Sequence, residues 1–243
     1  MPEGPSIVIL KEAVQQFAGH EIIAVSGNSK SGIDRLKDQT VIAFKSWGKH
    51  FLICFEEFTV KVHLLMFGTY RINERKENEP RLSMVFSNGE LNLYTCSITF
   101  LEGDVNLHYD WSADVMNENW NPKAAKKKLK EFPQQMICDV LLDQNIFSGV
   151  GNIIKNEILY RTFVHPESLV GKLSAAKLTR IIKECSVYSF EFLEWKKVYE
   201  LKKHWLAYTK KLCLRCDLPI QYKHTGSRKR RSFYCPNCQK LYL

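Results

Sequence analysis

The chain has 243 residues, of which 45% are apolar and 25% are charged, a composition typical of a soluble globular protein. It contains no run of about 18 apolar residues, so no membrane-spanning helix is expected. Charged residues such as Glu3 and Lys11 interrupt the apolar positions near the start, which argues against a signal peptide. The expected location is the cytoplasm, and the length allows two modest domains.

The net charge of +9 is unevenly distributed along the chain. Residues 1–113 carry 11 basic against 14 acidic side chains, whereas residues 114–243 carry 24 against 12. Such an excess of Lys and Arg in one half indicates a polyanionic partner that is held mainly by that half. A basic surface that is merely solvated is the alternative interpretation.

A helix is expected at residues 6–17, where apolar side chains recur at helical spacing between Pro5 and Gly19. Seven short segments rich in β-branched and aromatic residues follow without an intervening helix, which predicts an antiparallel β-sandwich. These segments are residues 21–27, 40–47, 50–57, 59–67, 69–72, 81–87 and 90–100. The first domain is therefore assigned to residues 1–113.

The character of the sequence changes near residue 110, where a polar stretch rich in turn-forming residues is typical of a linker. Helical patterns follow at residues 122–132, 135–146, 152–162 and 174–202. The predicted fold class is α+β and multidomain. It comprises the antiparallel sandwich, a helical domain at residues 114–209 and a small cysteine-containing module at residues 210–243.

The eight cysteines fall into two groups. Four lie in apolar contexts and are expected to be buried: Cys54, Cys96, Cys138 and Cys185. The other four form two Cys-x-x-Cys pairs with 18 residues between them, the spacing of a zinc ribbon: Cys213, Cys216, Cys235 and Cys238. Four thiolates complete the tetrahedral shell of one Zn²⁺ ion, so this zinc is expected to be structural. Two disulfides are the alternative.

Between the two cysteine pairs, two strand-like arms flank a Gly-Ser turn. A basic cluster lies beside this turn: Arg228, Lys229, Arg230 and Arg231. Guanidinium groups on a rigid hairpin suit phosphate groups or a DNA groove, so the cluster predicts contact with nucleic acid. Runs of charge are also common on solvated surfaces, which is the alternative.

Residues 141–166, LLDQNIFSGVGNIIKNEILYRTFVHP, are typical of a helix, a turn and a second helix. Gly149 and Gly151 allow the backbone to turn tightly, and Asn152 is a good N-cap for the second helix. Because backbone amides at the start of a helix bind anions, the segment is suited to binding a phosphate of a nucleic-acid backbone. The same residues could instead simply cap the helix.

Four motifs now occur in order along the chain: MPEGP, SWGKHFL, the segment just described, and RRSFYCPNCQ. Together they resemble the formamidopyrimidine-DNA glycosylase/endonuclease VIII family of base-excision repair enzymes, over essentially the whole chain. The family's fold is an N-terminal β-sandwich, a helix–two-turns–helix domain and a zinc finger, in agreement with the expected order of elements. The resemblance implies a monomeric, bifunctional DNA glycosylase/AP lyase. Its partner would be double-stranded DNA containing oxidised bases or abasic sites.

The resemblance assigns catalytic roles to Pro2, Glu3, Lys49 and Arg230. Once Met1 is removed, Pro2 would attack C1′ of the damaged nucleotide as a secondary amine. The resulting iminium cannot lose its charge at nitrogen and therefore drives elimination of the 3′-phosphate. Glu3 would act as the acid/base, and Lys49 would assist elimination. Arg230 would grip the phosphates that flank the lesion and support the second elimination.

DNA binding is implied for a further set of residues. Gly151 and Asn152 match the turn and the phosphate-binding asparagine, and Glu157 matches a glutamate inside the second helix. One structural Zn²⁺ ion is the implied cofactor. Position 6, usually glutamate in the family, is Ser6 here, which leaves the role of that carboxylate in substrate handling open.

The formamidopyrimidine branch carries an Arg-Arg-Phe loop that inserts opposite the extruded base, and the corresponding LYTCSITF of this chain lacks those arginines. The chain therefore looks closer to the endonuclease VIII branch. Its wedge would lie in HLLMFG, with Leu65, Met66 and Phe67 as candidates, because exposed apolar residues could fill the gap left by a flipped base. Packing of these three residues into the core is the alternative.

Three other functions remain compatible with the sequence. The protein could bind damaged DNA without catalysis, although Pro2, Glu3 and Lys49 argue against this. It could be an RNA-binding zinc-ribbon protein, which would bind single-stranded RNA at least as well as duplex DNA. Within the same family, it could prefer oxidised purines such as 8-oxoguanine over oxidised pyrimidines such as thymine glycol.

Overall fold

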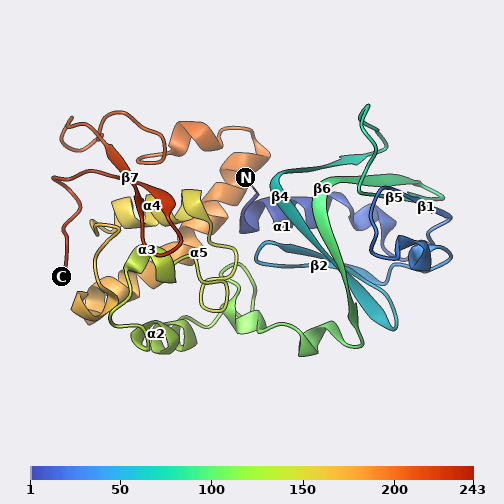
Figure 1. The fold of residues 1–243 in the computed structure, drawn as a ribbon, viewed down its shortest axis with the longest axis horizontal. Helices are drawn as coiled ribbons and strands as arrows, with labels where there is room; N and C mark the ends of the chain where they lie inside the picture. Colours follow the sequence, from blue (N-terminus) through green and yellow to red (C-terminus); the bar gives the residue numbers. More distant parts are fainter. Residues whose placement is uncertain (1) are drawn as a thin grey trace. The chain divides into compact units, whose positions relative to one another are not determined.

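An antiparallel β-sandwich forms the first of two units in the computed structural model, which describes residues 2–243 (Figure 1). This unit ends at Asp110, and the second unit begins at Trp111. The first unit contains one helix and six strands: α1 (Gly4–Ala13), β1 (Ala24–Ser26), β2 (Ala43–Trp47), β3 (His50–Cys54), β4 (Phe58–Ile72), β5 (Leu82–Phe86) and β6 (Gly89–Glu102). The predicted sandwich is confirmed.

The six strands are hydrogen-bonded in the order β1-β5-β6-β4-β3-β2, and every neighbouring pair is antiparallel. Strands β4 and β6 are long enough to take part in both halves of the sandwich. The first part of β4 pairs with β3, and the first part of β6 pairs with β5. The two long strands therefore connect the halves, as their length in Figure 1 shows.

A bulge interrupts the pairing of β4 with β6, whose register shifts between Leu64 and Thr69. The two segments expected at residues 59–67 and 69–72 are consequently one strand, β4, rather than two. A side chain at Gly68 would lie 2.8 Å from the backbone oxygen of Thr95, so only glycine fits this close approach of the two strands.

Helix α1 closes the core of the first unit. It packs against β2 and β3 and buries Ile7 and Leu10 completely. These side chains join a buried cluster that includes residues of β2 to β6, such as Phe51 and Leu93. Because burying apolar area contributes about 25 cal/mol per Å², this cluster fixes the start of α1 against the sheet.

The second unit contains four α-helices and a two-stranded ribbon: α2 (Pro122–Lys130), α3 (Ile137–Val140), α4 (Asn152–Arg161), α5 (Ala175–Lys197), β7 (Gln221–Thr225) and β8 (Arg230–Tyr234). The helix expected at residues 135–146 is wrong for most of its length. After α3 the backbone continues as turns, in which Leu142 and Asp143 donate to carbonyls three residues earlier. Gln144 then bridges the loop, accepting the Gly149 N–H and donating to the Val150 carbonyl.

Helix α4 lies at the centre of the second unit (Figure 1), and every one of its residues from Asn152 to Tyr160 is buried. Such a helix can be stable only if its neighbours satisfy its polar side chains. The ribbon β7–β8 packs on it, so the boundary expected near residue 209 falls inside a single compact unit. Within residues 2–243, no helix combines the length and hydropathy needed to cross a membrane.

Candidate functional site

Pro2 and Glu3 lie at the start of α1, where the backbone changes from extended to helical. Pro2 is half-buried, whereas Glu3 has no exposed surface. The Ser6 hydroxyl accepts the Glu3 N–H at 3.5 Å, one half of a capping box. Ser6, which replaces the glutamate usual at this position, therefore helps to hold the backbone of Glu3.

Lys49 lies in the two-residue turn that joins β2 and β3. Trp47 pairs with His50, which leaves Gly48 and Lys49 as the turn between the strands expected at residues 40–47 and 50–57. Gly48 has φ of 52°, a conformation that glycine adopts without strain. Because α1 packs against both strands of this hairpin, the elements that carry Pro2, Glu3 and Lys49 contact one another.

Two histidines form a half-buried cluster beside this turn. His50 and His63 are cross-strand neighbours with ring centroids 5.6 Å apart, and Nδ1 of His50 is 3.2 Å from the Tyr109 hydroxyl. Burial, together with the charges of His63, Lys61 and Lys49, lowers the pKa of His50 to about 4. Burial and the Lys49 ammonium also lower the pKa of His63. Both rings are therefore neutral at pH 7, next to a positively charged turn.

The three wedge candidates project at the bulge of β4. Their exposed fractions are 45% for Leu65, 55% for Met66 and 78% for Phe67, so packing into the core does not account for them. Contiguous exposed apolar side chains are unusual on a soluble surface and indicate a contact site. Insertion into DNA stays a prediction.

The four cysteines of the two Cys-x-x-Cys pairs converge. Their sulfur atoms lie within 4.8 Å of one another, and the separations Cys213–Cys238 and Cys216–Cys235 are 3.7 and 3.5 Å. A tetrahedral ion with Zn–S bonds of about 2.3 Å requires sulfur atoms about 3.8 Å apart. All eight cysteines are free, so the alternative of disulfides is not realised, and the four predicted buried cysteines are buried. The cluster could hold one metal ion.

Helix α4 supports this cluster directly. The Tyr160 hydroxyl lies 3.2 Å from Sγ of Cys213. The Arg215 guanidinium stacks 3.9 Å from the centre of the Tyr160 ring and donates to the Tyr160 carbonyl at 2.9 Å. Hydrogen bonds of this kind orient a ligand around a metal.

Asn152 is the first residue of α4 rather than its N-cap, a position that Gly151 occupies in an extended conformation. The Asn152 side chain is only 6% exposed, and its Nδ2 donates to the Arg231 carbonyl at 3.0 Å. One hydrogen of this amide is therefore committed to β8. Asn152 joins the helix start to the basic ribbon, and its contact with phosphate stays a prediction.

Glu157 is held inside the second unit, and the DNA contact implied by the resemblance stays a prediction. Its side chain is completely buried, and its carboxylate accepts three backbone N–H groups, from Leu206 at 2.8 Å, Ala207 at 3.0 Å and Tyr208 at 2.7 Å. Both carboxylate oxygens of Glu157 are therefore occupied by backbone donors. Glu157 holds the chain segment that leads into the first cysteine pair.

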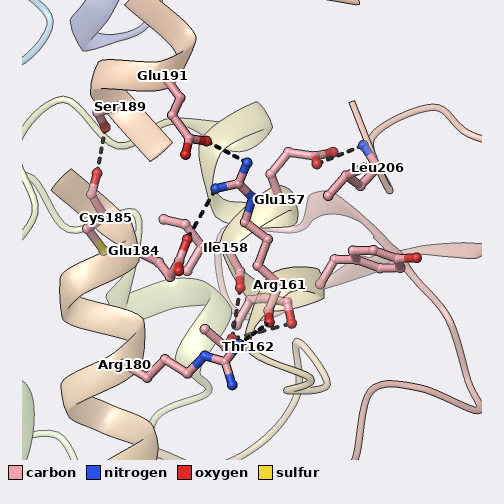
Figure 2. A network of polar contacts seen from close by, with 12 residues as sticks. Glu157, Ile158, Arg161, Thr162, Arg180, Glu184, Cys185, Ser189, Glu191 and Leu206 are labelled. Carbon is pink, nitrogen blue, oxygen red and sulfur yellow. Dashed lines mark hydrogen bonds and ion pairs between the residues drawn. The ribbon is translucent and has the colours of Figure 1, made fainter. Parts of the chain in front are cut away.

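Figure 2 shows how the C-terminal end of α4 is fixed to α5. The Arg161 guanidinium lies 3.3 Å from the Glu184 carboxylate and 2.6 Å from that of Glu191. It also stacks on the Tyr188 ring at 4.6 Å. Glu157 therefore ties α4 to the segment before the first cysteine pair, and Arg161 ties the last turn of α4 to α5.

Arg230 is the first residue of β8 and pairs with Thr225 of β7. The sequence missed two residues that hold this strand. Nζ of Lys155 lies 2.8 Å from the Ser232 hydroxyl, and Oδ1 of Asn156 accepts the Phe233 N–H at 2.7 Å. The sequence contained a signal for these two residues. Apolar residues occur all around the helix at residues 152–160, which indicates that the helix is buried and that its polar side chains need hydrogen-bond partners.

Comparison with known proteins shows the family. The model of the formamidopyrimidine-DNA glycosylase N-terminal domain matches residues 1–100, and that of its H2TH domain matches residues 112–188. Formamidopyrimidine-DNA glycosylase of Escherichia coli O6:K15:H31 is 31% identical over 277 residues, which cover 99% of this chain and 100% of that protein. Endonuclease 8-like 3 of Xenopus laevis is 28% identical over 90% of this chain but 38% of its own length.

Solved structures show the same fold. A Lactococcus lactis formamidopyrimidine-DNA glycosylase bound to DNA with an AP site superposes with a TM-score of 0.87, covering 98% of this chain and 99% of that chain at 21% identity. A viral DNA glycosylase gives a TM-score of 0.84, covering 98% and 100% at 21% identity. The chain therefore has the fold that these two structures share, with a helix–two-turns–helix domain.

The chain belongs to the formamidopyrimidine-DNA glycosylase/endonuclease VIII family, on the endonuclease VIII side. It spans about two fifths of the length of the endonuclease 8-like 3 protein that it matches. Endonuclease 8-like 2 of Bos taurus, 30% identical over 74% of this chain, is matched over 58% of its length.

The buried neutral His50 predicts acid sensitivity of the first unit. In the unfolded chain His50 gains its proton near its ordinary pKa of 6.5, whereas in the folded unit it does so only near pH 4. Its contribution to stability is therefore complete above about pH 6.5 and is lost as the pH falls toward 4. After allowance for partial solvent exposure, we expect a loss of roughly 2 kcal/mol in the free energy of unfolding.

Urea unfolding at a series of pH values measures this loss. We expect His50→Gln to flatten the dependence between pH 6.5 and 4, and the exposed His108→Gln to leave it unchanged. An equally steep dependence in His50→Gln would show that other groups are responsible.

Replacing one of the four clustered cysteines should reduce metal binding and DNA binding together. We expect Cys216→Ser to lower the zinc content and to release the ribbon from α4, because the metal stabilises the folded ribbon. The first unit has its own core and should stay folded. Metal analysis and DNA titration test this, with Cys54→Ala as the control. Full DNA cleavage by zinc-free protein would contradict it.

Proposed function

We propose that the protein is a bifunctional DNA glycosylase/AP lyase that removes oxidised bases from duplex DNA and then cleaves the strand. The observation that carries this proposal is the placement of Pro2 directly ahead of α1, next to the buried carboxyl of Glu3. An amine at the start of a helix lies at the positive end of the helix dipole, which favours its neutral, nucleophilic form. Family membership supports the same chemistry.

The first step is attack of the Pro2 nitrogen on C1′ of the damaged nucleotide, with departure of the base. The Pro2 N–H proton would pass to the departing base, and opening of the sugar ring, with protonation of its oxygen, would leave an iminium between Pro2 and C1′. Because the nitrogen of this iminium carries no hydrogen, the positive charge persists and withdraws electrons from C2′. Loss of a C2′ proton then expels the 3′-phosphate, which breaks the strand.

Glu3 and Lys49 support this step in different ways. Glu3 would protonate the sugar ring oxygen and exchange protons during formation and hydrolysis of the iminium. Lys49 supplies a positive charge that favours the developing phosphate leaving group. Because the rings of His50 and His63 are neutral at pH 7, they add no positive charge beside Lys49.

The second unit would hold the phosphate backbone. Its basic residues, the start of α4 and Arg230 on the ribbon are suited to phosphate groups on either side of the lesion. A structural Zn²⁺ ion, held by the four cysteines, would keep the ribbon folded and would take no part in the chemistry. Leu65, Met66 and Phe67 would fill the gap left by the extruded base.

The exposed apolar wedge favours the endonuclease VIII branch, whose members we expect to act on oxidised pyrimidines. Preference for oxidised purines is the second candidate within the family. Parallel assays on duplexes that carry thymine glycol or 8-oxoguanine distinguish the two.

A covalent intermediate at Pro2 can be trapped. We expect borohydride to reduce the iminium to a stable amine and to link the protein to an abasic duplex, but not to an undamaged one. Protein that retains Met1 is the matched control, because its Pro2 nitrogen is an amide without an available lone pair. Strand cleavage at full rate by this control would refute the role of Pro2.

Glu3 should matter more for base release than for strand cleavage. Removal of an acid/base group typically costs 10²–10⁴-fold in rate. We therefore expect Glu3→Gln to slow release of an oxidised base by at least about 100-fold, and to slow cleavage of a ready-made abasic site much less. Gel assays on the two substrates measure the ratio. An equal loss on both would assign Glu3 to a later step.

DNA binding should weaken steeply with salt, because basic side chains release counterions from the phosphates that they contact. We expect Arg230→Ala to weaken binding of lesion and undamaged duplexes alike and to reduce the slope of log K against log salt by about 0.9. Arg35→Ala is the control, since Arg35 pairs with Glu102 in the first unit. A slope unchanged by Arg230→Ala would exclude this phosphate contact.

A further inference from the structure

A carboxylate sits beneath the tip of the ribbon that carries the arginines. We call this ribbon, β7 and β8 with the turn of residues 226–229, the arginine hairpin. Oδ2 of Asp139 accepts the Ser227 N–H at 2.7 Å and the Ser227 hydroxyl at 3.1 Å. Its Oδ1 accepts the Arg228 N–H at 3.3 Å. Both oxygens of one side chain on α3 are therefore used by the turn.

The turn is shaped for this carboxylate. Gly226 has φ of +70°, and a side chain there would place Cβ 2.3 Å from Oδ1 of Asp139, well inside contact distance. Only glycine allows the backbone to approach so closely. The Arg228 guanidinium also donates to the Leu142 carbonyl at 3.2 Å, which fastens the same turn to the segment after α3.

Strand β8 of the arginine hairpin is fixed separately by α4, just beyond the turn. The Arg231 carbonyl lies within hydrogen-bond distance of three donors: Nδ2 of Asn152 at 3.0 Å, Nζ of Lys155 at 3.4 Å and Nδ2 of Asn156 at 3.3 Å. Arg230 therefore lies between two anchored points, the turn on Asp139 and the strand on α4.

A carboxylate in this place opposes the attraction of a polyanion. A negative charge beside Arg228 and Arg230 lowers the local positive potential, and on electrostatic grounds alone DNA would bind better without it. Its geometry offers a compensating gain, because it orders the turn before DNA arrives. Ordering a flexible loop during binding costs affinity, so a loop that is already ordered binds more tightly.

We propose that Asp139 is a positioning residue that fixes the tip of the arginine hairpin, so that Arg230 is pre-organised for a DNA phosphate. This inference rests on the proposed function, since it needs the hairpin to contact DNA. It assigns no contact with DNA to Asp139 itself.

The substitution Asp139→Asn distinguishes ordering of the turn from charge repulsion, because the two effects change the affinity for DNA in opposite directions. One oxygen becomes an NH₂ group that faces an N–H donor, so the turn loses part of its anchor while a negative charge disappears. We expect roughly tenfold weaker binding to an abasic-site duplex, the equivalent of one lost charged hydrogen bond. Electrostatics alone predicts tighter binding.

Asp143→Asn is the matched control. It removes the same charge from the same segment, but Asp143 uses only Oδ1, which accepts the Asn145 N–H at 2.9 Å, and asparagine can keep that bond. We expect its affinity to be unchanged or slightly higher. Gly226→Ala, which keeps every charge, should weaken binding as Asp139→Asn does.

Amide hydrogen exchange in the DNA-free, zinc-loaded protein reads the order of the turn directly. We expect faster exchange at Ser227 and Arg228 in Asp139→Asn, and no change in Asp143→Asn, at equal zinc content. Unchanged exchange, or DNA binding by Asp139→Asn that is as tight as that of the native protein, overturns the proposal. If Arg230→Ala leaves binding intact, the DNA contact fails while the exchange result still tests the anchor.

Discussion

The buried polar face of α4 is the constraint on which the second unit depends. Four consecutive or nearly consecutive side chains, Asn152, Lys155, Asn156 and Glu157, are removed from water. Burying such groups without partners would cost several kcal/mol each. Strand β8 and the backbone of residues 206–208 supply most of the partners, so α4 is stable only when packed against them.

This constraint gives the metal cluster and the arginine hairpin a common support. Tyr160, one turn beyond Glu157, contacts a cysteine of the cluster, and Asn152 at the other end contacts the strand of Arg230. A metal ion would stabilise the cysteine end, whereas Asp139 holds the opposite tip. The basic hairpin is therefore defined by three separate contacts rather than by its own two strands, which alone would be marginally stable.

The first unit uses a different principle. Pro2, Glu3 and Lys49 are placed by backbone geometry at the ends of elements: the beginning of α1 and the turn between β2 and β3. The apolar core under α1 keeps these ends in place, and the neutral histidines beside Lys49 prevent further accumulation of charge at pH 7. Gly68 makes a bulge in β4 possible. At this bulge Leu65, Met66 and Phe67 are all exposed, whereas in a regular strand alternate side chains would face the core.

The sequence by itself determined the order of sandwich, helices and cysteine module, since periodicity and Cys-x-x-Cys spacing are local properties of the chain. The motifs around Pro2, Lys49 and Asn152 likewise identified the family. Only the tertiary structure decided that residues 59–72 form one bulged strand, that the helix after residue 135 is short, and that Glu157 is buried. Each of these depends on partners distant in sequence, as does the contact between Asp139 and a turn 88 residues away, which no local pattern contains.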